Sequence, residues 1–224
     1  MPLPFCIEKL IRLYKIWKRG PRAANDHATN IPVLCALGLL FEVRSVLELG
    51  SGLFSTLSFL NKDLFPDLEF IHSYENNPEW HAKVNEQTRR DNRITLTYVD
   101  GPLAVLVPGI ELSTYDLIFI DDGTKAAVRA ESIKAVVRHH SPHNVIVVHD
   151  FDVETYIRAA EGVSKQFTMK AYNPHTGILW DAAALTTRQL RLANRLIRKN
   201  VHRLEPTDAH TWHEVLKPLA KKRY

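Results

Sequence analysis

The sequence predicts an α/β fold with a doubly wound, mostly parallel sheet. Short apolar runs recur between residues 46 and 180, and most are separated by segments with helical apolar spacing. The first run, 46–49, leads into Gly50-Ser51-Gly52, after which helical spacing resumes. A strand, a tight glycine turn and a helix in this order are typical of a nucleotide-binding unit, because the new helix presents free amide groups to an anionic ligand.

The size of the chain suits one domain with appended pieces. Its 224 residues are 45% hydrophobic, which is enough for a full core. We expect the domain over residues 28–185, a basic amphipathic helix and a covering loop over residues 1–27, and a basic helical extension over residues 186–224. No apolar run could span a membrane and no signal-peptide pattern begins the chain, so the sequence predicts a cytoplasmic protein.

The formal net charge of +4 is unevenly distributed. Residues 1–25 hold 6 Lys or Arg and 1 acid, residues 26–185 hold 13 and 21, and residues 186–224 hold 10 and 3, which gives +5, −8 and +7. Basic ends of this kind can bind nucleic acid or an anionic lipid surface. They can equally lie on the acidic centre or remain solvated, and the sequence leaves these alternatives open.

The first expected helix covers residues 5–18, where apolar residues at helical spacing alternate with Lys and Arg. Its apolar stripe suits docking on the domain, contact with a partner or with a second copy in a homodimer, or binding to a membrane surface. A polar segment at 22–30 then leads into an apolar helix at 31–42.

A second strand is expected at 69–75, after a helix at about 55–64. This strand ends in Glu75, about 25 residues after the glycine turn, which is roughly the spacing of a ribose-binding acid in a βαβ unit. An Asn-Pro pair then begins a helix over about 78–90.

Two later strands end in clusters of titratable residues. The strand at 115–120 is followed by Asp121-Asp122, and the strand at 144–148 is followed by His149-Asp150. Open α/β sheets bind their ligands at the carboxyl ends of their strands, so both clusters are candidates for a functional site. The remaining elements are a strand at 94–99 that ends at Asp100-Gly101, helices at 125–140 and about 153–164, and a hairpin of strands at 166–172 and 176–180.

The run 48–52, Glu-Leu-Gly-Ser-Gly, together with Glu75, resembles the class I S-adenosylmethionine-dependent methyltransferases. In that family the first loop reads acid-x-Gly-x-Gly, and the second strand ends in the acid that holds the ribose hydroxyls. Ser55 stands where a dinucleotide fingerprint needs a third glycine, which disfavours a nicotinamide or flavin cofactor. The resemblance covers about residues 28–183 and implies a Rossmann-like, seven-stranded sheet in the order 3-2-1-4-5-7-6, with the last strand antiparallel.

This resemblance implies S-adenosylmethionine as the cofactor and a small molecule as the acceptor, methylated on oxygen or nitrogen. The cofactor contacts that it implies are Glu48, Gly50, Ser51, Gly52, Glu75, Asp100, Gly101 and Asp121. The family also folds the segment before its first strand over the methionine end of the cofactor. Asp26, His27 and Thr29 are therefore further candidates, although an ordinary helix-capping loop would explain them as well.

The expected catalytic residues are His149, Asp121 and Asp150. His149 is the natural proton acceptor because the ordinary pKa of histidine lies near neutrality, and the two carboxylates can orient it or bind the acceptor. The alternative is a strand-end histidine that only satisfies loop backbone.

A magnesium-assisted reaction is also open, because Asp121 and Asp150 stand where the catechol-type O-methyltransferases hold the ion. Phe151 replaces the asparagine expected after Asp150, so the sequence favours a site without a metal. Two other functions remain open: a nucleic-acid methyltransferase that uses the basic ends, and a non-catalytic, methyltransferase-like binding module.

Overall fold

The computed structural model describes residues 25–123, 125–182 and 185–222. The helix expected at 5–18 therefore lies outside the described residues. The strands are β1 Ser45–Leu49, β2 Phe70–Glu75, β3 Ile94–Tyr98, β4 Leu117–Ile120, β5 Val145–His149, β6 Lys165–Met169 and β7 Thr176–Trp180. The α-helices are α2 Ile31–Leu40, α3 Ser55–Leu60, α4 Pro78–Thr88, α5 Ala126–His139, α6 Glu154–Ala159, α7 Thr187–Asn200 and α8 Ala209–Leu216.

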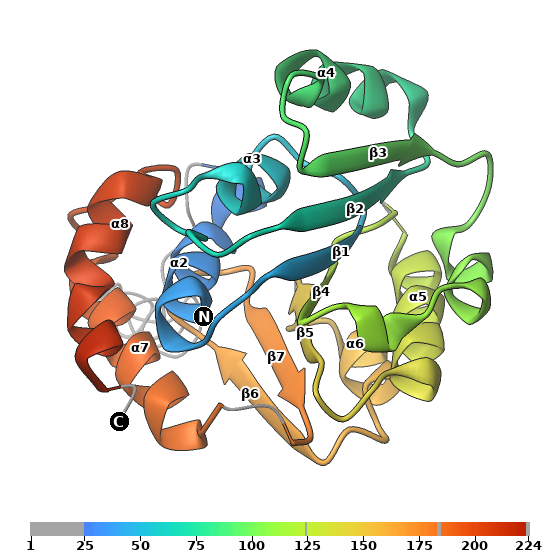
Figure 1. Cartoon of the computed structure of the whole chain (residues 1–224). Coiled ribbons are helices and arrows are strands. Elements are labelled where there is room, and N and C mark those ends of the chain that lie inside the picture. Colours follow the sequence, from blue (N-terminus) through green and yellow to red (C-terminus); the bar gives the residue numbers. More distant parts are fainter. Residues whose placement is uncertain (1–24, 124, 183–184, 223–224) are drawn as a thin grey trace, which may run out of the picture.

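Within these residues, the strands form one sheet in the order β3-β2-β1-β4-β5-β7-β6. The pairs among the first five strands of this order are parallel, and β7 is antiparallel to both β5 and β6. The predicted fold class, strand order and antiparallel last strand are confirmed. Figure 1 shows the sheet between two sets of helices.

Both faces of the central strands are buried, which explains why their sequences are continuous apolar runs. In β4, Leu117 and Phe119 belong to the core beneath α2, α3, α7 and α8, whereas Ile118 and Ile120 belong to the core beneath α5 and α6. Helix α2 is buried along its whole length and contacts α7 and α8. The C-terminal helices thus share the core of the domain (Figure 1).

Several elements are shorter than expected, and one segment was not expected at all. Helix α6 ends at Ala159 rather than near 164, and Gly162 follows it with a φ of +121°. Between β3 and β4, short 3-10 helices stand at Leu103–Val105, Val107–Gly109 and Leu112–Thr114. None of the helices described is long and apolar enough to cross a membrane.

Candidate functional site

A pocket of about 810 Å³ opens at the carboxyl ends of β1, β2, β4 and β5. Its lining comes from the segments that follow these four strands, from α5 and α6, and from the turn of 3-10 helix η1, Asp26–Ala28. Pockets for small molecules and cofactors usually enclose about 300–1,000 Å³, so the volume suits a ligand of nucleoside size. Asp26 and His27, which the sequence placed in a covering loop, lie in this lining.

Gly50 lets the turn after β1 pack against the end of β4. Its φ is +89°, and a Cβ built on it would lie 2.6 Å from the carbonyl carbon of Asp121 and from the amide nitrogen of Asp122. Glycine is therefore required both for the backbone conformation and for the close approach. Ser51 and Gly52 line the pocket, whereas Gly50 lies outside the lining.

Glu48 lies beneath this turn and outside the pocket lining. The side chain is fully buried and accepts hydrogen bonds from the hydroxyls of Thr56 at 2.7 Å and Ser73 at 2.6 Å. The Thr56 hydroxyl in turn accepts the amide of Gly52 at 3.0 Å. Burial raises the pKa of Glu48 to about 7. These contacts support the turn, and direct contact between Glu48 and a cofactor stays a prediction.

Glu75 lies in the pocket lining with its carboxylate held by three donors. Oε1 accepts the backbone amides of Asn76 at 2.9 Å and Asn77 at 2.7 Å, and Oε2 accepts the hydroxyl of Ser51 at 3.3 Å. Burial is the largest influence on the group and raises the pKa of Glu75. The ends of β1 and β2 are thus joined through this side chain, as expected of two neighbouring functional segments.

The structure does not bring Asp100 and Gly101 into the pocket lining. Asp100 is exposed, and the carbonyl of Gly101 accepts the side-chain amide of Asn76 at 3.0 Å. Their contact with adenine stays a prediction.

Trp80 is a pocket residue that the sequence reasoning missed. Its indole N–H donates to the carbonyl of Ser51 at 2.5 Å, and the ammonium of Lys83 lies 5.5 Å from the ring centroid. An aromatic residue in the first turn of the helix after the ribose-type acid was the available signal. The ring gives the pocket an apolar wall beside Glu75.

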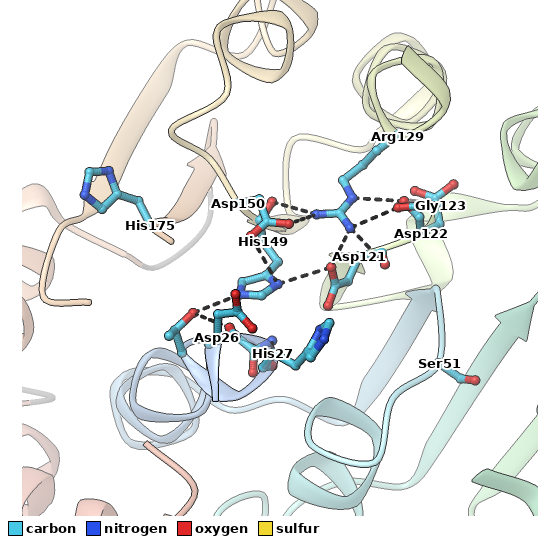
Figure 2. Close-up of polar contacts among 12 residues, drawn as sticks. Asp26, His27, Ser51, Asp121, Asp122, Gly123, Arg129, His149, Asp150 and His175 are labelled. Atoms are coloured by element: carbon cyan, nitrogen blue, oxygen red, sulfur yellow. Dashed lines mark hydrogen bonds and ion pairs between the residues drawn. The ribbon is translucent and has the colours of Figure 1, made fainter. Parts of the chain in front are cut away.

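The three expected catalytic residues lie together at the ends of β4 and β5 (Figure 2). Nδ1 of His149 is 3.2 Å from Oδ1 of Asp121 and 3.8 Å from Oδ1 of Asp150. On the other side of the ring, Nε2 is 2.9 Å from the hydroxyl of Thr29, which precedes α2. His175, by contrast, points away from the group in Figure 2.

Both ring nitrogens of His149 have a hydrogen-bond partner. Nδ1 faces a carboxylate, and Nε2 faces the Thr29 hydroxyl, which also lies 3.0 Å from the carbonyl of Asp26. When this hydroxyl donates to Asp26, its oxygen accepts from Nε2–H, and the arrangement suits an imidazolium. Burial opposes this charged form, but Asp121 and then Asp150 outweigh it, and the pKa of His149 is raised. The same imidazolium and Arg129 outweigh the effect of burial on Asp121, so the pKa of Asp121 is lowered.

Arg129 of α5 binds the ends of β4 and β5 together, and the sequence reasoning missed it. Nη2 lies 2.8 Å from Oδ1 of Asp121, and Nη1 lies 2.7 Å from Oδ2 of Asp150. The guanidinium also donates to the carbonyls of Asp121, Asp122, Gly123 and His149. Its position on the buried stripe of α5 with Ile133 and Val136 was the available signal, because an arginine there needs buried partners.

No protein-family model and no curated protein matches the chain. Solved structures do match its fold. A spermidine synthase in complex with the transition-state analogue AdoDATO superimposes with a TM-score of 0.54 at 15% identity, over 72% of this chain and 63% of that one. The chain thus spans less than two thirds of that synthase.

Two methyltransferases are also similar. One from Geobacter sulfurreducens gives a TM-score of 0.51 at 10% identity, over 82% of this chain and 92% of that one. The S-adenosylhomocysteine-bound methyltransferase PaMTH1 from Podospora anserina gives 0.52 at 13% identity, over 80% and 98%. The protein has the fold of the class I methyltransferases, with a pocket at the carboxyl ends of its strands.

Proposed function

We propose that the protein binds S-adenosylmethionine in this pocket and transfers the methyl group to an oxygen or nitrogen atom of a small molecule. The observation that carries the proposal is the shared lining of one pocket by the glycine turn, Glu75 and the ends of β4 and β5. The bound S-adenosylhomocysteine of PaMTH1, which has the same fold, supports it.

The residues present suit this cofactor. Ser51 and Gly52 offer backbone at the pocket wall, and the carboxylate of Glu75, already oriented by three donors, has one lone-pair site left on Oε2 for a ribose hydroxyl. Trp80 supplies an apolar surface for the nucleoside. When bound, the cofactor supplies an electrophilic methyl group on a sulfonium, and the protein contributes alignment.

On the acceptor side, burial opposes the charged form of His149, but the two carboxylates beside the ring raise its pKa and favour the imidazolium, which changes the role expected of His149. An imidazolium cannot accept a proton, whereas the side chains of Asp121 and Asp150 pair with Arg129 and are 20% and 31% exposed. We therefore assign proton acceptance to one of these carboxylates and orientation of Asp121 to His149. Asp26 and His27 close this end of the pocket from the N-terminal side.

Titration calorimetry with S-adenosylmethionine and S-adenosylhomocysteine tests the proposal. We expect a Kd between about 1 μM and 1 mM, the usual range of substrate KM values. Glu75→Gln should weaken binding at least about tenfold, because an NH2 group, which cannot accept, replaces the carboxylate oxygen that would accept a ribose hydroxyl. Glu86→Gln, on the exposed side of α4, is the matched control and should bind normally. No detectable heat with the wild-type protein would reject the proposal.

A second candidate, methylation of nucleic acid, is favoured by one observation. Helix α7 presents cations along its exposed face, and residues 182–204 contain no Asp or Glu. The exposed cations of this stretch are Arg188, Arg191, Arg195, Lys199 and Arg203. Phosphate contacts by these residues would make RNA binding steeply dependent on salt. Fluorescence anisotropy of a labelled RNA between 50 and 200 mM salt, roughly the range over which such affinities collapse, tests this, and weak binding that salt does not change removes the candidate.

A further inference from the structure

The cluster at the ends of β4 and β5 has the composition of a cation site. Asp121, His149 and Asp150 each offer a ligand atom, and these atoms lie within 4.8 Å of one another in the part of the chain that the structure describes. Carboxylate oxygens suit a hard divalent cation such as Mg²⁺ or Mn²⁺. Two carboxylates this close repel one another unless a positive group lies between them.

Arg129 already makes the contacts that such an ion would make. Its two terminal nitrogens lie 2.8 Å from Asp121 and 2.7 Å from Asp150, one on each carboxylate. Figure 2 shows the guanidinium between the two strand ends, with its N–H groups directed at both carboxylates and at the neighbouring carbonyls. Arg129 as a whole is only 6% exposed, so solvent does not compete for these contacts.

We propose that the guanidinium of Arg129 takes the place of a divalent cation between Asp121 and Asp150, so that this pocket works without a metal ion. Arg129 is then a positioning residue: it fixes the carboxylates that face the pocket. The proposal concerns the cluster itself and does not depend on the identity of the methyl donor or acceptor.

The remaining contacts of Arg129 make its displacement by an ion unfavourable. The five N–H groups of a guanidinium are directed here at two carboxylates and four carbonyl oxygens. An entering ion would have to break these bonds and leave a buried, unpaired cation beside its own charge, which costs several kcal/mol. The guanidinium stays charged at any ordinary pH, so it cannot lower this cost by losing a proton.

Two features next to the cluster agree with this assignment. Asp150 has a φ of +58°, and its carbonyl accepts the amides of Asp152 at 2.8 Å and Val153 at 3.1 Å, which fixes the turn that presents Oδ2 to Arg129. Phe151 follows and is 2% exposed, with its ring against Gly177, where an added Cβ would lie 2.3 Å from Cγ. The residue after Asp150 is therefore packed in the core and offers no oxygen ligand.

Electron paramagnetic resonance of Mn²⁺ tests the proposal without any measurement of activity. The wild-type protein should leave the signal of free Mn²⁺ unchanged. Arg129→Ala frees both carboxylates and opens space, so it should bind Mn²⁺ with a Kd of about 1 mM or tighter, as weak oxygen-ligand sites do. Adding Asp121→Asn to that variant should remove the gain. Arg138→Ala, at an exposed position of the same helix, is the matched control and should behave as wild type.

Two outcomes of this experiment would contradict the proposed role of Arg129. Mn²⁺ binding by the wild-type protein that Asp121→Asn abolishes would overturn the proposal, and so would a folded Arg129→Ala protein that binds none. Circular dichroism establishes the folded state, and Arg129→Gln, which keeps two N–H donors, replaces Arg129→Ala if the latter does not fold. Calorimetry with S-adenosylmethionine on the same samples tests the proposed function independently. A wild-type protein that binds no nucleoside can still exclude Mn²⁺, so the two proposals can fail separately.

Discussion

Glu48 and Asp121 are carboxylates at the ends of neighbouring strands, and their surroundings shift their pKa values in opposite directions. Glu48 lies near the end of β1 and is bonded to hydroxyl groups, and burial raises its pKa to about 7. Asp121 follows β4, and although burial opposes its ionisation, His149 and Arg129 lower its pKa. The register places Leu49 beside Ile120, so the two groups share one region of the sheet. The difference shows that a fixed cation, rather than depth alone, decides whether a buried carboxylate is charged here.

Removal of the cation should give the largest effect. Arg129→Ala leaves two carboxylates and four carbonyls without their donor, and we expect it to lower the free energy of unfolding by about 3–5 kcal/mol. Urea denaturation at pH 7 measures the change. Arg138→Ala, with no buried partner, should stay within about 0.5 kcal/mol of wild type. A loss below about 1 kcal/mol for Arg129→Ala would mean that Asp121 does not depend on this cation.

A second prediction concerns Glu48, where a substitution should stabilise the protein above pH 7 rather than destabilise it. Since its pKa rises from 4.5 to about 7 on folding, the folded protein holds this proton more tightly than the unfolded chain. The stabilisation is complete below pH 4.5 and is lost as the pH rises through about 7, by up to about 3 kcal/mol. Glu48→Gln removes this titration, so the variant should become the more stable protein above pH 7.

Urea denaturation at intervals between pH 4.5 and 8 measures this dependence. The curve of Glu86→Gln, which changes the same chemistry at an exposed site, should run parallel to that of the wild type. If the curve of Glu48→Gln also runs parallel to it, the raised pKa of Glu48 is refuted.

The two carboxylates also show what the sequence could predict. Both strand ends were recognisable, because each acid follows an apolar run and the order of such runs defines the sheet. His149 was recognisable as a partner of these carboxylates, but Arg129 and the contact of Thr29 with His149 were not. Arg129 reaches Asp150 from a helix that packs across the sheet, and Thr29 meets His149 across 120 residues of sequence. Such pairs arise only when helices and strands are placed in three dimensions.

The direction of a side chain is a further limit on sequence reasoning. Glu48 was expected to contact a cofactor because it begins the glycine motif. In the structure it accepts hydrogen bonds from Thr56 and Ser73 beneath the turn, and its contact with a cofactor stays a prediction. Period-two alternation in a strand fixes the face of each side chain but not which face the ligand will use. Glu75 was expected at the end of its strand, and the structure places it in the pocket lining, where the amides of Asn76 and Asn77 hold its carboxylate.

Thr29→Val should give a smaller effect, because it removes one hydrogen bond and keeps the shape. Without the hydroxyl, the Nε2–H of the imidazolium has no acceptor, so the pKa of His149 should fall and stability at pH 6 should drop by about 1–2 kcal/mol. The raised pKa of His149 contributes stability below about pH 6.5 that is lost as the pH rises through the folded value, and in Thr29→Val this loss should be smaller and be complete at lower pH. NMR titration of the imidazole measures the shift.

Thr29→Ser keeps the hydroxyl and should titrate as wild type. An unchanged titration of His149 in Thr29→Val would show that Asp121 alone sets its protonation, and the assigned direction of the Thr29 hydrogen bond would then be wrong.

The smallest effect on stability is expected at Arg195, on the exposed face of α7. Arg195 is exposed, and in the described parts of the chain neither it nor Arg191 forms an ion pair. Removing a solvated charge changes stability by less than about 0.5 kcal/mol, so Arg195→Gln should unfold at the same urea concentration as wild type. A loss of the size expected for Arg129→Ala would show that α7 has a buried acidic partner. If Arg195→Gln instead keeps full stability but weakens RNA binding and reduces its salt dependence, the exposed arginines act on ligands, whereas the buried one holds the pocket together.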